Sequence, residues 1–91
     1  MMKPISDPVT TACAKTLTLL AARAVDATVC PSEVARTMAA SDPGAPAWRD
    51  LMPVVHRGVD RLLAEERVRL RWKGQALATR TGPYRIARAV R

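Results

Sequence analysis

The sequence predicts a mainly α-helical domain that ends in a small antiparallel β-hairpin. Three segments before residue 66 repeat apolar residues at the three- and four-residue spacing of a helix face. After Glu65 the apolar spacing changes to two, the period of a half-buried strand. A chain of 91 residues has the size of one domain. We therefore expect a single domain over residues 8–91, preceded by a disordered lead-in at 1–7.

The first helix is expected to run from Pro8 to about Val25. Asp7 followed by Pro8 is typical of an N-cap and a first-turn proline. A single narrow stripe suited to packing is formed by Val9, Cys13, Leu17, Leu20 and Ala24. The short segment that follows, Thr28 to Cys30, is able to pair as the edge of a sheet.

A second, short helix is expected over residues 31–40, with a proline in its first turn and Glu33 three residues after Cys30. This spacing matches a capping box, although a thiol replaces the usual hydroxyl and is a weak acceptor. The turn-forming run at 41–46, Ser-Asp-Pro-Gly-Ala-Pro, cannot continue the helix. It therefore separates the second helix from a third.

The third helix is predicted over residues 48–65 and organises the rest of the chain. Asp50 is its expected N-cap, Pro53 its first-turn proline, and Gly58 indicates a close approach of another element. Its core stripe consists of Met52, Val55, Val59, Leu62 and Leu63. Arg57 and Arg61 fall on the other side, where they could read a partner. The alternative is that both are simply solvated and that Arg61 pairs with Glu65.

Two strands are predicted after this helix. Val68, Leu70 and Trp72 alternate with three arginines, so the apolar side chains would face the core. Gly82-Pro83 introduces a second strand, with Tyr84 and Ile86 facing inward. The connecting loop is basic and contains Lys73, Gly74 and Arg80. Three helices followed by such a hairpin describe a winged helix-turn-helix domain, with residues 67–88 as the wing.

The net charge of +7 indicates an anionic partner. Basic and acidic residues cancel over residues 1–46, so the excess lies in the second half, where ten of eleven basic residues are arginine. The arginine side chain suits phosphates and base edges, and a localised basic surface is typical of nucleic-acid binding. The alternative is that the arginines reflect genome composition and serve only solubility.

Other functional classes find little support in the sequence. A single histidine and two cysteines without a CxxC spacing do not predict a metal site or a catalytic triad, and no phosphate-binding glycine loop is present. We expect no enzyme activity and no cofactor. Cys13 and Cys30 are expected to be free thiols. No apolar run resembles a signal or a membrane span, so we expect a cytoplasmic, bacterial-type protein.

The sequence also resembles a small bacterial winged-helix family of unknown function. The resemblance rests on the following runs: Cys-Pro-Ser-Glu-Val-Ala-Arg at 30–36, Trp48-Arg49, Leu51-Met52-Pro53 with Val55, Lys73-Gly74, and Gly82-Pro83-Tyr84-Arg85-Ile86. It covers roughly Thr11 to Ile86. The chain departs from the family pattern at His56 and at 78–80. The resemblance implies the winged-helix fold and no particular activity.

The expected function is binding of double-stranded DNA, in transcriptional regulation, with the 48–65 helix in the major groove and the wing on the backbone. The expected nucleic-acid-binding residues are Arg49, Arg57, Arg61, Lys73 and Arg80. Trp48 and Trp72 could stack on bases, but a core role is favoured for both. The alternatives are docking of an acidic protein partner and RNA binding. The sequence leaves the target and the oligomeric state open.

Overall fold

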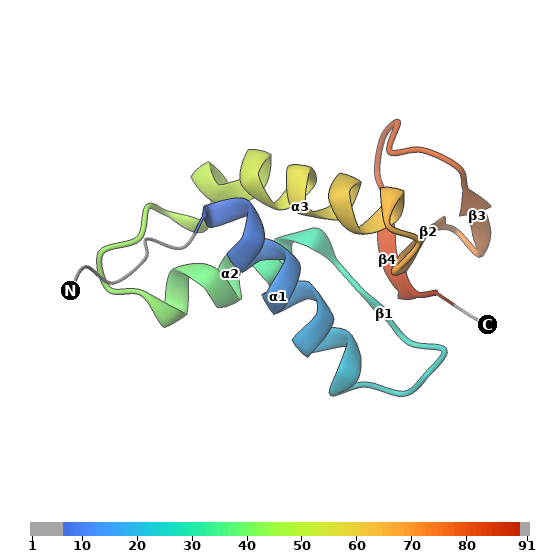
Figure 1. Cartoon of the computed structure of the whole chain (residues 1–91), viewed down its shortest axis with the longest axis horizontal. Helices are drawn as coiled ribbons and strands as arrows, with labels where there is room; N and C mark the ends of the chain where they lie inside the picture. The colour runs from blue at the N-terminus through green and yellow to red at the C-terminus, as the bar shows by residue number, and fades with distance from the viewer. Residues whose placement is uncertain (1–6, 90–91) are drawn as a thin grey trace.

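The computed structural model describes residues 7–89, which form a mixed α/β fold with three α-helices and a four-stranded antiparallel sheet (Figure 1). Most of the predicted lead-in, residues 1–6, lies outside the described residues. In chain order the elements are α1 (Pro8–Ala21), β1 (Thr28–Val29), α2 (Pro31–Ser41), the 3₁₀ helix η1 (Trp48–Leu51), α3 (Met52–Ala64), β2 (Val68–Trp72), β3 (Gln75–Leu77) and β4 (Arg85–Arg88).

Helix α1 begins as predicted but ends earlier. The Oδ1 atom of Asp7 accepts a hydrogen bond from the Val9 N–H at 3.0 Å, which confirms the N-cap. The predicted extension to Val25 is wrong, because the helix ends at Ala21 and Val25 is 68% exposed. Arg88 donates from β4 to the carbonyl oxygens of Leu20 and Arg23 at 2.7 Å each. A distant side chain thus satisfies the carbonyls at the helix end, which no local pattern reveals.

Helices α1 and α3 cross closely at Gly58, as the sequence predicted. A Cβ atom at Gly58 would lie 3.0 Å from the Cβ of Ala12 and 3.4 Å from the backbone of Val9 and Cys13. The Cys13 thiol donates to the Gly58 carbonyl at 3.3 Å. Burial raises the pKa of this thiol. Both cysteines are free, as expected, and Cys13 serves the helix contact.

The predicted second helix is confirmed, whereas the third is divided. The Glu33 carboxylate accepts from the Cys30 N–H at 3.1 Å, so the acidic half of the capping box is present. The predicted 48–65 helix consists of η1 followed by α3, and the predicted cap at Asp50 is wrong. Because η1 already turns helically, the Asp50 N–H bonds to the Ala47 carbonyl and Leu51 occupies the N-cap of α3 without a side-chain bond.

The sheet has the strand order β1-β4-β2-β3. The predicted pairing of the two C-terminal strands is confirmed, with Leu70 opposite Ile86, and β1 adds an edge with Val29 also opposite Ile86. Strand β3, in a region left unassigned by the sequence, pairs with β2 on the other side. The expectation that Trp72 faces the core is wrong, since its exposed fraction is 38%. It ends β2 opposite Gln75 and borders a surface hollow that Met52 and His56 of α3 also line.

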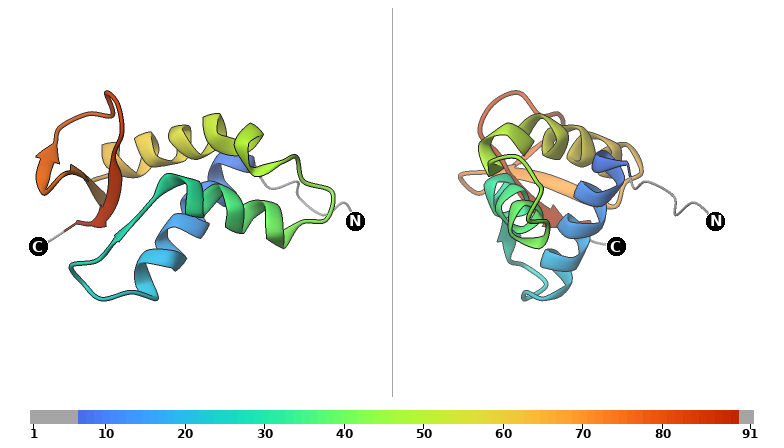
Figure 2. Two further views of the ribbon diagram at one scale, coloured as in Figure 1. Left: turned by 180° about the vertical axis from the view of Figure 1, so that it is seen from behind. Right: turned by 90° about the vertical axis from the view of Figure 1, so that its left-hand side faces the viewer.

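The core lies between the helices and one face of the sheet. Its largest fully buried side chains are Leu62, Leu70, Ile86, Val29, Val34, Val55, Val59, Val68 and Thr16. The molecule extends 45 × 26 × 23 Å, with the sheet at one end and the start of α3 towards the other (Figures 1 and 2). No helix within residues 7–89 has the length and apolar character needed to cross a bilayer. Because α3 runs from near one end of the molecule towards the sheet at the other, it connects two separate surface regions (Figures 1 and 2).

Candidate nucleic-acid interface

The exposed face of α3 is the side that the sequence assigned to a partner. It consists of Pro53, Arg57, Asp60, Arg61 and Ala64, while Val55, Gly58, Val59 and Leu62 are buried on the opposite side. Within residues 7–89 Arg57 forms no ion pair. Its guanidinium is therefore available to a ligand.

Arg61 has partners that the sequence did not suggest. Its Nη1 donates to Thr10 Oγ1 at 3.1 Å, and its Nη2 lies 3.7 Å from Asp7 Oδ2, both at the start of α1. The alternative pairing with Glu65 is absent from the ion pairs of the described residues. Arg61 thus remains on the exposed face of α3 but shares its charge with Asp7.

The loop at residues 78–84, between β3 and β4, is fastened to α3 by an ion pair. Arg80 donates from Nε to Oδ1 of Asp60 at 3.0 Å and from Nη2 to Oδ2 at 2.9 Å. The hydrogen bonds from Arg80 hold the pKa of Asp60 below its ordinary value. A bidentate pair of this kind fixes both position and orientation. Arg80, expected as a phosphate contact, is therefore already engaged by a carboxylate.

A second contact fastens the same loop to α3. His56 Nδ1 and Tyr84 Oη are 2.7 Å apart, and Tyr84 is only 4% exposed. Burial raises the pKa of Tyr84, so the phenol stays protonated and can donate to a neutral imidazole. Burial, and then the nearby Arg80, lower the pKa of His56. The sequence marked His56 as a departure from a family pattern, and the structure gives it a role in holding the loop.

Arg49 lies at the other end of α3, in contact with an aromatic ring. Its Cζ is 4.7 Å from the ring centroid of Trp48, and the Cζ of Arg36 from α2 is 4.5 Å from the same centroid. Both arginines are exposed, and neither forms an ion pair among residues 7–89. Arg36 was not among the residues predicted from the sequence, because only the course of the loop before Trp48 brings α2 beside this ring. Two unneutralised cations therefore flank the start of α3.

Lys73 lies in the tight turn between β2 and β3, at the sheet end of the molecule. Its φ of 51° is followed by 79° at Gly74, so both central residues adopt left-handed conformations. Two such residues suit the right-handed twist of a hairpin. The lysine is exposed and forms no ion pair within the described part of the chain.

The outer face of the sheet, which points away from the core, carries additional arginines. Register places Arg71 directly opposite Arg85, and Arg69 lies two residues before Arg71 on the same strand face. Arg85 donates to Thr28 Oγ1 at 2.6 Å. Like charges directly opposite each other in a sheet are unfavourable, and an anion bound between them would relieve the repulsion.

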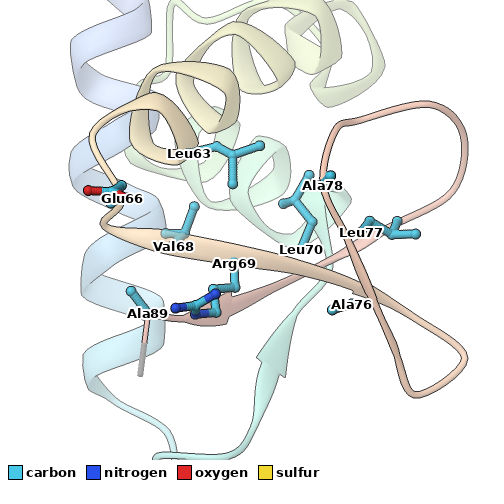
Figure 3. A pocket seen from close by; sticks show the side chains of 9 residues that line it. All are labelled: Leu63, Glu66, Val68, Arg69, Leu70, Ala76, Leu77, Ala78 and Ala89. Carbon is cyan, nitrogen blue, oxygen red and sulfur yellow. The ribbon is translucent and has the colours of Figure 1, made fainter. Parts of the chain in front are cut away.

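A small pocket lies between the end of α3, β2 and β3, with a volume of about 270 Å³ (Figure 3). Its lining residues are Leu63, Glu66, Val68, Arg69, Leu70, Ala76, Leu77, Ala78 and Ala89. Apart from Glu66 and Arg69 these side chains are apolar and offer no nucleophile. Residues 7–89 also contain no group of three potential metal ligands. The pocket therefore adds no support for a catalytic site.

Comparison with known families gives one match. A model described as a protein of unknown function (DUF3253) covers residues 10–89, most of the chain. The chain belongs to the DUF3253 family. No curated protein matches it. The family description states no activity, so the inference of function for this DUF3253 domain depends on the geometry of its charged surfaces.

Proposed function

We propose that this protein binds double-stranded DNA as a winged helix-turn-helix domain and regulates transcription. The chain order supports the proposal, because α2, a loop and α3 precede β2, β3 and β4, β2 pairs with β4, and β1 completes the sheet beside β4. The observation that carries it is the exposed face of α3, where Arg57 forms no ion pair among residues 7–89. Two further cationic regions lie on either side of it, one at the start of α3 and one at the sheet end.

Each cation receives a role from its position. With its 13 residues α3 spans roughly 20 Å. The major groove of B-DNA, about 12 Å wide, accommodates an α-helix. Arg57 and Arg61, on the exposed face of α3, are assigned to base edges. Arg49, at the start of η1, and Lys73, in the β2–β3 turn, are assigned to phosphates on either side. Arg80 holds the 78–84 loop on Asp60 and would reach a phosphate only by leaving that carboxylate.

A salt titration of binding tests the proposal. If about 5–7 phosphates are neutralised, the logarithm of the affinity for duplex DNA should fall with the logarithm of salt concentration at a slope near −5 to −6. Duplex RNA of the same sequence and length serves as the comparison. Equal or tighter binding to RNA would replace DNA with RNA as the partner, and absence of binding to either at low salt would reject the proposal.

Two variants separate reading of bases from contact with the backbone. Arg57→Ala should reduce the preference for a selected site, because a bidentate contact between arginine and guanine discriminates by about 1–3 kcal/mol. Lys73→Asn should weaken binding to all sequences alike and reduce the salt slope by about one. Asparagine suits this position because it tolerates the left-handed backbone. If neither variant loses the preference for the selected site, α3 contacts only the DNA backbone.

An acidic protein is the second candidate partner, supported by the outer face of the sheet. Arg69 and Arg71 there form no ion pair among residues 7–89, and the face carries no aromatic side chain on which bases could stack. The double variant Arg69→Glu, Arg71→Glu should abolish binding to an acidic protein. If it leaves duplex binding intact while Arg57→Ala reduces it, the two surfaces have separate partners.

A further inference from the structure

Trp48 holds two arginines from different elements against one neutral ring. Arg49 follows it in η1, whereas Arg36 comes from α2 on the far side of the 42–47 loop. The two Cζ atoms lie 4.7 Å and 4.5 Å from the ring centroid, within the range of a cation–π contact. Arg36 and Arg49 are thus brought to the same site by the tertiary fold.

The chemistry of this contact leaves both arginines able to bind an anion. An aromatic ring attracts the face of the guanidinium but accepts no hydrogen bond from the N–H groups in its plane. Those donors remain free, and neither arginine forms an ion pair within residues 7–89. Stacking also restricts two long side chains before a ligand arrives, which reduces the entropy lost on binding. The Asp60 carboxylate has the opposite effect on Arg80, since it uses the donors themselves.

We propose that Arg36 and Arg49, positioned by Trp48, form a clamp for one stretch of sugar-phosphate backbone beside the start of α3. This inference rests on the proposed DNA binding and adds to it the site at which the backbone is held. Two guanidiniums with free forks suit the adjacent oxygens of phosphate groups. Because η1 runs directly into α3, phosphates held here would fix how far the helix enters the groove.

The first measurement uses the fluorescence of Trp48. The chain has two tryptophans, and Trp72 is exposed outside the core, so Trp72→Phe leaves Trp48 as the sole indole. In this background a short DNA duplex should change the emission of Trp48, because phosphates bound to the two guanidiniums change the electric field at the ring. The change should disappear in the double variant Arg36→Ala, Arg49→Ala.

The second measurement compares salt slopes between matched double variants. Arg36→Ala, Arg49→Ala should weaken duplex binding by about tenfold for each arginine and reduce the salt slope by about two. The control, Arg69→Ala, Arg71→Ala on the outer face of the sheet, removes the same charge and should leave most of the slope unchanged. If both double variants lose the same affinity and the same part of the salt slope, the clamp is overturned and the effect is one of net charge alone. The proposed DNA binding would still stand.

The third measurement tests the positioning role of Trp48. Trp48→Leu keeps both arginines but removes the ring, so affinity should fall while the salt slope stays near that of the wild type. Trp48→Phe should restore part of the affinity, and it replaces the leucine variant if that variant does not fold. Wild-type affinity in a folded Trp48→Leu protein would overturn the positioning role. Failure of the wild type to bind any duplex would instead reject the proposed function.

Discussion

At the start of α3, Arg36 and Arg49 contact the neutral ring of Trp48, whereas further along the helix Arg80 is bound by both oxygens of Asp60. The first arrangement keeps two positive charges available at the surface. The second neutralises a charge and holds the 78–84 loop against α3, together with the contact between His56 and Tyr84.

A count of arginines therefore does not locate a binding surface. Sequence alone placed Arg49 and Arg80 in the same group of expected nucleic-acid-binding residues. In the structure Arg49 contacts the indole ring of Trp48 and its N–H donors remain available. Arg80 instead donates its hydrogen bonds to Asp60 within the protein. The partner of each cation, rather than its number in the chain, decides whether it contributes to stability or to recognition.

The largest expected effect concerns the middle of α3, which sets the distance between the two ends. Gly58→Val would place methyl groups against the backbone of α1, where even a Cβ would lie 3.0 Å from that of Ala12. Overpacking of this kind costs about 1–3 kcal/mol. Chemical denaturation should show this loss. Gly82→Val is the control, because nothing lies within 4 Å of a Cβ there, and equal stability of both variants would contradict the close crossing.

A smaller effect is expected when the ion pair of the loop is broken. Asp60→Asn should lower the free energy of unfolding by about 0.2–1 kcal/mol, since the pair is partly exposed. It also frees Arg80, so the salt slope for duplex binding should steepen by about one.

Asp50→Asn, which makes the same change of charge at the other end of α3, is the control for this test. Asp50 forms no ion pair among residues 7–89, so its replacement should leave the unfolding free energy nearly unchanged and release no arginine. If both variants alter the slope equally, Arg80 is not restrained by Asp60 in solution, and the contrast between the two ends of the helix fails.

The smallest expected effect is a pH dependence confined to the loop end. Because burial and then Arg80 lower the pKa of His56 in the folded state, the unfolded state binds the proton more readily. The free energy of unfolding should therefore have its full value above the ordinary pKa of about 6.5 and fall as pH drops through that value.

His56→Gln is the matched variant, since its amide oxygen can still accept from Tyr84 but does not titrate. Denaturation between pH 7 and about 5.5 should show a flatter stability profile than that of the wild type. The pKa values of Glu33 and Asp60 are lowered by hydrogen bonds from Arg23 and Arg80, so those carboxyls affect stability only at lower pH. An unchanged slope in His56→Gln would show that His56 is not the titrating group.

Local chemistry was enough for much of the fold. Periodicity of the apolar residues predicted α2 and both paired strands, and Asp7 with Pro8 marked the start of α1, because each of these patterns reflects contacts within one turn or one strand. Gly58 marked the helix crossing, because a glycine within a helix favours the close approach of another element. Local chemistry failed where distant groups intervene. Arg88 satisfies the end of α1 from β4. The cap predicted at Asp50 failed for a local reason, because residues 48–51 form a 3₁₀ turn in which the Asp50 N–H bonds to the Ala47 carbonyl.

The candidate interface divides in the same way. By itself the sequence determined that the excess positive charge lies in the second half and that Arg57 and Arg61 share the polar side of a helix, since composition and helical spacing are local properties. Which of these charges remain available depends on contacts between elements. The tertiary structure joined Arg80 to Asp60 and Arg61 to Asp7, and it brought Arg36 beside Trp48. These pairings join residues 12 to 54 positions apart, so only the packing of whole elements could bring them together.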